Sequence, residues 1–279
     1  MTTHDADHKP TNKAKPWLLG TALLVLAALV VFVSVKVLSP DNTDESTDVA
    51  PAAPAPEHSG DSEDTDVNAK GWDSSIADVF GRNIRVPANG VGIALGEAEK
   101  LKDTQCDVGA PAELTIQRTS GTQTIWSEDI GPSSVNEGEV PVGYARSAEA
   151  AMVAAANDLA LFYSGGDSTL EVTKSRLSSP NLDAMIAEAE KGSEKDPQAV
   201  NQPAPSAFKI TSCDENRVIG DLAMPLPTDA TGDPNAPTWG VMRISSVWEN
   251  GDWKTEIGGV PQPLEDEIDD LEGWQQWVY

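Results

Sequence analysis

The fold is decided by the stretch Trp239-Gly-Val-Met-Arg-Ile-Ser-Ser-Val-Trp-Glu-Asn-Gly-Asp-Trp-Lys-Thr-Glu-Ile257. Two β-like runs flank Asn250-Gly251, a pair that suits a type I′ turn because both central residues need a positive φ. A two-residue turn places Trp248 opposite Trp253, where the two rings can pack across the strands. The same register puts the other apolar and hydroxyl side chains on that face, namely Ile244, Ser246, Thr255 and Ile257. The stretch therefore predicts an antiparallel hairpin.

Further strands are expected around this hairpin. Ala207–Thr211 and Arg217–Met224 are β-like runs joined by a turn at Asp-Glu-Asn. Pro225–Pro237 is rich in Pro, Asp and Gly and predicts a loop. After the hairpin come the acidic run Glu265–Asp270 and a tail ending Leu-Glu-Gly-Trp-Gln-Gln-Trp-Val-Tyr. We expect the acidic run to be a solvated surface segment and the tail to dock its Trp residues on the domain.

The helices are expected before these strands. Ser147 is a good N-cap, Ala148–Tyr163 is rich in strong helix formers, and Gly165 or Gly166 ends the run. Its apolar face suits close packing on a sheet and consists of Met152, Ala155, Leu159 and Phe162. A weaker helix is predicted over 167–177. A third begins at Ser179-Pro180 and ends at Gly192.

The segment 71–142 is harder to interpret because Gly and Pro punctuate it. Short β-like runs occur at 84–86, 114–117 and 124–126. A short helix is predicted over 96–102. These features predict a β-rich segment preceding an α+β domain over 143–279.

Trp17–Val35 is an uninterrupted apolar run without a charged residue. At about 1.5 Å per residue a helix of this length spans roughly 28 Å, close to a bilayer's hydrocarbon core. Lysines precede the run and carboxylates follow it, so the N-terminus is expected in the cytoplasm and the C-terminal part outside. The alternative is a cleaved signal peptide, whose apolar core is usually shorter. We predict a single-pass cell-membrane protein with a transmembrane signal-anchor at 17–38.

Two polar segments flank this anchor. Residues 1–16 form a short cytoplasmic tail, and 39–70 is acidic and rich in Pro and Ala. Such a composition cannot offset the entropy cost of ordering, so 39–70 is predicted to be a disordered tether. Pro51, Pro54 and Pro56 should stiffen its middle into extended chain.

The formal net charge is −26 at pH 7. A charge of this size and sign disfavours nucleic acid as a partner, because nucleic acid is itself a polyanion. The two cysteines, Cys106 and Cys213, both lie on the predicted outer side. An even count in an oxidising compartment makes one disulfide plausible, and two separate buried thiols are the alternative.

The predicted folded part lacks several residues and motifs on which common catalytic sites depend. All three histidines precede it (His4, His8 and His58). This excludes Ser-His-Asp and Cys-His systems and His-based zinc sites there. A phosphate loop is also absent from the sequence. We therefore predict no catalytic, cofactor-binding or metal-binding residues. Paired carboxylates could still act as acid and base, although pairing by chance is expected among 45 acidic residues.

Five tryptophans cluster in the C-terminal part of the sequence and are candidates for a pocket or for the core, namely Trp239, Trp248, Trp253, Trp274 and Trp277. They could line a binding pocket or a carbohydrate platform. The simpler interpretation, which we favour, is that they form the hydrophobic core beneath a small sheet.

The order of a small-residue helix, further helices and strands closing on Trp248-Glu-Asn-Gly-Asp-Trp253 resembles the NTF2-like (cystatin-like) α+β fold. That resemblance implies a curved antiparallel sheet with helices packed into its concave face. Gly131-Pro132, followed by Pro141 to Ala155, is similar to uncharacterised membrane-anchored or secreted proteins of actinobacteria. These often accompany integrative conjugative elements, and Ala150 stands where their pattern has Gly. The resemblance covers the chain from about Trp126 to the C-terminus. Because the folded part contains no His, its likeness to the enzymes among NTF2-like proteins is weaker.

These observations predict a non-catalytic structural or protein-interaction module of the cell envelope. The resemblance to the actinobacterial proteins further implies that this module belongs to a conjugation or secretion assembly. Its expected partners are the lipid bilayer, through the N-terminal helix, other envelope proteins and a second copy of the chain. The alternative is an extracytoplasmic ligand- or lipid-binding domain with an apolar pocket in the sheet cone. A deep pocket lined by Trp would favour the alternative, and a filled core with an exposed apolar patch would favour the module.

Overall fold

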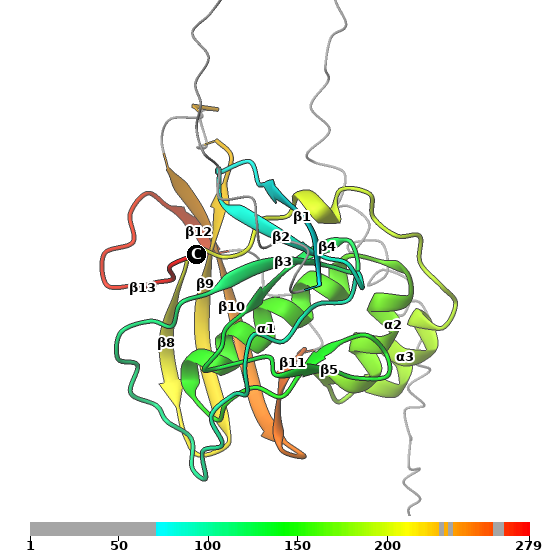
Figure 1. Ribbon diagram of the computed structural model, residues 1–279. Coiled ribbons are helices and arrows are strands. Elements are labelled where there is room, and N and C mark those ends of the chain that lie inside the picture. The colour runs from blue at the N-terminus through cyan, green and yellow to red at the C-terminus, as the bar shows by residue number, and fades with distance from the viewer. Residues whose placement is uncertain (1–70, 229–231, 234–236, 259–264) are drawn as a thin grey trace, which may run out of the picture. The chain divides into compact units, whose positions relative to one another are not determined.

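A computed structural model describes residues 71–279, except 229–231, 234–236 and 259–264 (Figure 1). The described residues belong to one compact unit, Asp61–Tyr279. The helices in them are α1 (Ala148–Tyr163), α2 (Gly166–Ser175), α3 (Leu182–Ala189) and the 3-10 helix η2 (Ala199–Asn201). The strands are β1 (Trp72–Ala77), β2 (Asn83–Pro87), β3 (Thr115–Thr119), β4 (Thr122–Trp126), β5 (Ser134–Val135), β6 (Pro141–Val142), β7 (Leu177–Ser178), β8 (Ala207–Cys213), β9 (Arg217–Leu226), β10 (Thr238–Glu249), β11 (Asp252–Glu256), β12 (Glu265–Ile268) and β13 (Gln275–Gln276).

The first sheet consists of β1, β2, β3 and β4 in that order. β2 and β3 are parallel, and the other two pairs are antiparallel. Side-chain amides take the place of missing strand neighbours. Gln117 both donates to and accepts from the backbone of Ile93, at 2.7 and 2.8 Å. Asn157 of α1 does the same for Ile125 of β4, at 2.8 and 2.7 Å, and so ties the helix to the sheet edge.

The second sheet has the order β13-β8-β9-β10-β11-β7, and β12 also pairs with β10. The predicted hairpin is confirmed, because Trp248 pairs with Trp253 and Ser246 with Thr255. The turn residues Asn250 and Gly251 have φ of 56° and 86°, as a type I′ turn requires. The predicted strand pair before it is also present, as β8 and β9.

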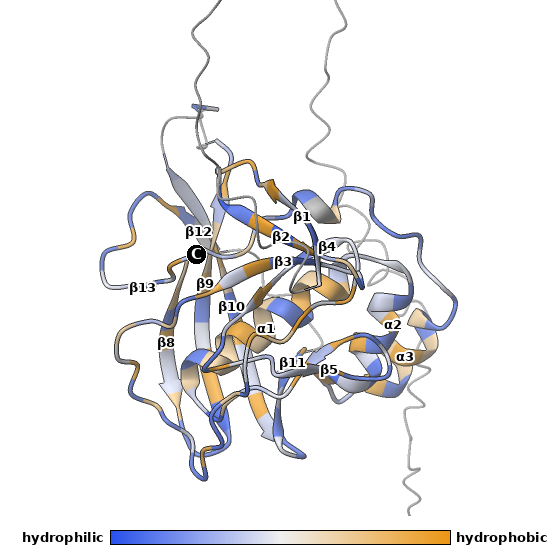
Figure 2. Ribbon diagram, viewed as in Figure 1, coloured by the Kyte–Doolittle hydropathy of each residue, from blue (hydrophilic) through white to orange (hydrophobic). Residues whose placement is uncertain are grey.

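The long helix α1 contacts β4 of the first sheet and β8 to β11 of the second (Figure 1). Ser147 caps it as predicted, with its hydroxyl accepting from the Ala150 N–H at 3.2 Å. We expected one apolar face, but every residue from Ala148 to Asp158 is buried. Alanines make this burial on both sides possible, because they let two sheets approach one helix. Much of α1 accordingly carries apolar colouring (Figure 2).

The remaining helices and the tail lie at the margins of this core. α2 begins and ends close to the predicted bounds, and α3 has no fully buried residue. The helix predicted over 96–102 is wrong: those residues form no regular structure, because the connection between β2 and β3 follows the surface. The tail docks through Trp277, which is 6% exposed, and through β13, which pairs with β8. The predicted acidic surface segment begins with an edge strand, β12.

The predicted fold class is wrong as a description of this structure. We expected a curved antiparallel sheet preceded by a β-rich segment. Both larger sheets instead contain a parallel pair, β2–β3 in one and β7–β11 in the other. Leu114 and Ile125, from the segment expected to precede the domain, share one core with α1 and the second sheet. The reason is that these pairings join residues far apart in sequence, whereas tight turns are the only pairings that a local pattern shows.

The membrane part of that prediction lies outside the residues that the structure describes. No helix in the described ranges is long and apolar enough to cross a bilayer. The predicted signal-anchor (17–38), tail (1–16) and tether (39–70) lie outside the described residues.

Candidate functional site

The five candidate tryptophans are spread between the core and its edges. Trp253 is fully buried, and Trp248 packs edge-on against it at 5.2 Å between ring centroids. Trp277 stacks against Phe208 at 4.8 Å, whereas Trp239 and Trp274 are half-buried. The indole N–H of Trp253 donates to the Ala145 carbonyl at 2.9 Å. None of the five lines the two hollows described below, so the structure favours the core interpretation for Trp248, Trp253 and Trp277.

Glu149 is a carboxylate that α1 carries into this aromatic core. Its Oε1 accepts from the Trp277 indole N–H at 2.9 Å and from the Ala112 backbone N–H at 3.0 Å. Burial raises the pKa of Glu149, and the two hydrogen bonds oppose that rise. The carboxylate therefore anchors the tail and the irregular segment just before β3 to the start of α1.

A buried ion-pair network ties three elements together. Arg176, which follows α2, donates from Nε to Asp158 of α1 at 2.9 Å and from Nη1 to Asp252 of β11 at 2.6 Å. Thr255 donates to the other oxygen of Asp158 at 2.7 Å. Burial raises the pKa of Asp158 to about 6, against the attraction of the Arg176 guanidinium.

Asp252 has a second role in the same network. Its carboxylate accepts from the backbone N–H groups of Gly143 and Tyr144, at 3.0 and 3.2 Å. These residues enter α1, so the network fixes the helix start against the hairpin. Neither Asp158 nor Asp252 lines the two hollows described below. The arrangement is suited to holding elements together rather than to acid–base chemistry on a ligand.

Cys106 and Cys213 are bonded to each other, with their Cα atoms 5.8 Å apart. The bond joins the long connection between β2 and β3 to the end of β8. Arg146 supports the same region by donating to the Lys102 carbonyl at 2.6 Å and to the Glu215 carbonyl at 3.0 Å.

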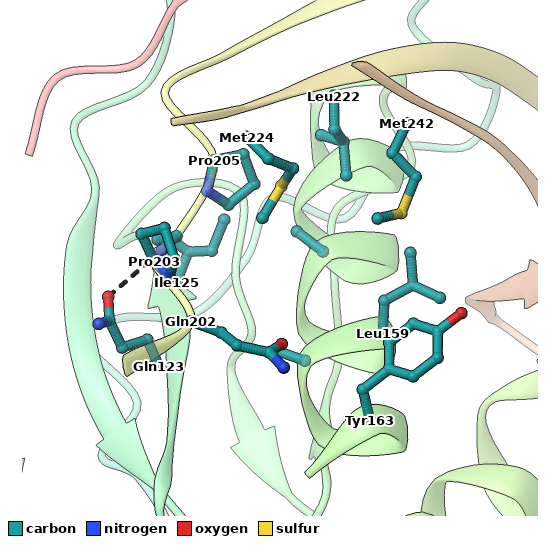
Figure 3. Close-up of a pocket in the computed structure, with 13 residues that line it drawn as sticks. Gln123, Ile125, Leu159, Tyr163, Gln202, Pro203, Pro205, Leu222, Met224 and Met242 are labelled. Carbon is teal, nitrogen blue, oxygen red and sulfur yellow. Dashed lines mark hydrogen bonds between the residues drawn. The ribbon is translucent and has the colours of Figure 1, made fainter. Parts of the chain in front are cut away.

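A small apolar recess opens where α1, β4 and the inner faces of β9 and β10 meet the segment 202–205 (Figure 3). Its volume is about 50 Å³, and none of its 13 lining residues is charged. Five half-buried or exposed side chains form its rim, and we call them the apolar patch: Leu159, Tyr163, Pro203, Met224 and Met242. Tyr163 is the most open of these, at 52% exposed.

The recess has one rigid wall. Ala204 donates its N–H to Gln123 of β4 at 3.2 Å, the contact drawn in Figure 3. Ala204 also packs with Ile84 of β2 and Ile116 of β3. The segment 202–205 is therefore held on the first sheet, while Met224 and Met242 come from the second.

A larger groove of about 650 Å³ lies over the opposite face of the second sheet. Its floor includes Arg243, Ser245 and Glu256, and the loop 178–180 forms one side. The polar groups of this sheet groove bind one another. Arg243 holds Asp221 through two hydrogen bonds of 2.7 and 3.1 Å, and Glu256 accepts from Ser245 and from Arg217, at 2.5 and 2.8 Å.

Comparison with known proteins gives a family for this architecture. Residues 86–276 match the model of a family described as a domain of unknown function (DUF8175). The chain belongs to this family. No curated protein and no solved structure matches it. The DUF8175 match spans the ion-pair network, the disulfide and the apolar patch, and it leaves out β1.

Sequence reasoning passed over the residues that build the ion-pair network and the apolar patch. Asn157-Asp158 is a polar pair inside a helix that is otherwise almost entirely apolar, and that interruption was the available signal for the network. The patch had no such signal, because its members come from α1, two strands and a loop that only the fold brings together.

Proposed function

We propose that this domain is a non-catalytic protein-interaction module that binds an apolar side chain of its partner at the apolar patch. The observation that carries the proposal is the small recess at the surface of the core, whose lining contains no charged residue. Interfaces concentrate their binding energy where one side chain fills a well-packed apolar pocket. A recess of about 50 Å³ suits one such side chain.

The compartment we propose is outside the cytoplasm, among other envelope proteins. The Cys106–Cys213 bond supports this, because disulfides persist in oxidising compartments. A conjugation or secretion assembly is the proposed setting, and its support is the resemblance of residues 131–155 alone. Attachment of the chain to a membrane stays a prediction from the sequence.

Ligand or lipid binding in the sheet cone is the less favoured function. Ligand pockets usually enclose about 300–1,000 Å³, and the recess offers about 50 Å³. The sheet groove reaches that range at about 650 Å³. Its guanidinium and carboxylate groups, however, are bound to one another, so a ligand would have to break Arg243–Asp221 or Arg217–Glu256.

The test is cross-linking of the full-length protein in native membranes, followed by purification and mass spectrometry. Three forms are compared: the natural sequence, the patch variant Tyr163→Asp with Met242→Gln, and the control Val79→Ser. Val79 suits the control because it is 69% exposed and does not line the recess.

The proposal expects an envelope protein that is recovered with the natural sequence and the control, and lost from the patch variant. Thermal unfolding of the three forms shows whether the patch variant is folded. Recovery of the same partner by all three forms would show that the partner does not bind at the apolar patch. Recovery of only the protein itself with a small molecule would support the ligand-binding alternative.

A further inference from the structure

We propose that Asn250, at the tip of the β10–β11 hairpin, is a site of spontaneous deamidation and isoaspartate formation in the folded protein. The sequence contains two Asn-Gly pairs, Asn89-Gly90 and Asn250-Gly251. The structure distinguishes the two pairs, and only the second is open to the reaction. The inference does not depend on the apolar patch, because neither pair lines the recess.

Deamidation needs an Asn side chain that is free to meet the backbone nitrogen of the next residue. That nitrogen attacks the side-chain carbon Cγ, so that a new N–Cγ bond closes a five-membered succinimide ring while the Cγ–Nδ2 bond breaks. The leaving nitrogen takes up the backbone proton and departs as ammonia. Water then opens the ring at one of its two carbonyl carbons and gives aspartate or isoaspartate. Glycine favours ring closure because it has no side chain beside the attacking nitrogen.

Asn250 meets these requirements. Asn250 and Gly251 are both exposed, and the Asn250 side chain makes no hydrogen bond to the residues that the structure describes. The pairing of the hairpin ends at Glu249 and Asp252. The N–H of Gly251 therefore lies outside the strand ladder, where solvent has access to its proton.

Asn89 belongs to the same kind of sequence pair in a closed arrangement. Its Nδ2 donates to the Gly92 carbonyl at 2.9 Å, and its Oδ1 accepts from the N–H groups of Val91 and Gly92, at 3.0 and 3.2 Å. The N–H of Gly90 donates to the Pro87 carbonyl at 3.0 Å. Both reacting groups are held in hydrogen bonds, so Asn89 reacts only when its loop opens.

Isoaspartate at position 250 disturbs the hairpin and the ion-pair network beside it. The product carries the main chain through the former side chain, which adds one backbone carbon to a two-residue turn that sets the strand register. Asp252 lies two positions further along. Its carboxylate accepts from the N–H groups that enter α1 and from the Arg176 guanidinium. The isoaspartate form should therefore unfold at a lower urea concentration.

Peptide mapping by mass spectrometry tests the proposal on the full chain in detergent micelles. The protein is incubated in mildly alkaline buffer, with and without a denaturing concentration of urea. Deamidation is measured from the mass gained when an amide NH2 becomes OH, and isoaspartate from methylation by protein L-isoaspartyl methyltransferase. Asn89 is the internal control. Asn250→Gly is the matched variant, because a Gly-Gly pair also suits a type I′ turn and has no side-chain amide.

The proposal expects the folded protein to lose ammonia at Asn250 and not at Asn89, and urea to make both positions react. It also expects the isoaspartate form, once separated, to unfold at a lower urea concentration than the unmodified protein, whereas incubation leaves the unfolding of Asn250→Gly unchanged. Equal conversion of the two positions in the folded protein would overturn the proposal. Protection of Asn250 until urea is added would overturn it as well.

Discussion

Glu149 and Asp158 are carboxylates of one helix, buried with different partners. Glu149 is held by two neutral donors, and Asp158 by Arg176 and Thr255. Burial raises the pKa of both above the ordinary value, so the folded state binds protons more readily than the unfolded state. Their contribution to stability is therefore complete below about pH 4 and is lost as the pH rises through the folded pKa, about 6 for Asp158.

We predict that the free energy of unfolding falls between pH 4 and pH 7, and that Glu149→Gln reduces this fall. The amide oxygen of Gln can accept both hydrogen bonds that Glu149 accepts, without a charge to desolvate. At pH 7 the variant should be at least as stable as the natural sequence. Urea unfolding across this pH range measures the effect, with the exposed Glu188→Gln as control. A loss of about 1 kcal/mol or more at pH 7, or an unchanged pH dependence, would contradict this account of Glu149.

Arg176→Met should cost about 3–5 kcal/mol, because the buried Asp158 loses its partner and must either hold an unpaired charge or take up a proton. Adding Asp158→Asn removes that charge and should restore a large part of the loss. A double-mutant cycle by denaturant unfolding isolates the coupling. If the two losses simply added, the network would not act as a unit.

The contacts of a single residue could be predicted from the sequence where its chemistry allows few partners. The two cysteines can form only one intramolecular disulfide. The tail tryptophans are large apolar side chains, which predicts that they pack against the domain. The partner of Asp158 was out of reach, because Arg176 and Asp252 lie 18 and 94 positions away along the chain. Nothing local distinguishes those two from other charged residues.

The hairpin and α1 were predictable as elements because their signals are local: a turn pair, a cap, a stop and a periodic pattern. What surrounds them was not. β2–β3 and β7–β11 are parallel pairs, and the residues they join have no turn between them to announce the pairing. For the same reason the sequence did not show that α1 packs against two sheets. Its alanine-rich surface is compatible with packing against one sheet or against two.

Close packing of α1 on the second sheet depends on Gly220 of β9. A Cβ there would lie 2.8 Å from Met152 Sδ and 2.9 Å from the Lys209 carbonyl. We predict that Gly220→Ala costs about 1–3 kcal/mol. Gly240 of β10 is the matched control, because its nearest neighbour would be Leu226 Cδ2 at 3.8 Å. Chemical denaturation of both variants decides the matter, and equal losses would show that the helix does not approach β9 so closely.

At the scale of the whole molecule, the disulfide closes a span of 107 residues. Replacing both Cys106 and Cys213 by Ala should lower the free energy of unfolding by about 2–4 kcal/mol, by enlarging the conformational freedom of the unfolded chain. Adding a reductant to the natural protein should produce the same loss, and should have no effect on the double variant. If the reductant left the free energy of unfolding of the natural protein unchanged, the disulfide would contribute little to stability.

In the part of the chain that the structure describes, buried charged groups hold elements together, and an apolar recess lies at the surface. Buried charges hold α1, the hairpin and the tail. The charged residues that line the sheet groove, Arg243 and Glu256, are held in ion pairs. The apolar patch is the surface at which we place the partner.

The most direct measurement is site-specific photo-cross-linking in native membranes, with a photoreactive side chain at position 163 of the patch or at position 79 of the β1–β2 turn. Both positions are occupied by exposed apolar residues, at 52% and 69%. The account predicts a defined protein adduct from position 163, absent from position 79 and lost when Met242→Gln is added. No adduct at position 163, or the same adduct at both positions, would contradict the claim that the patch is the binding surface.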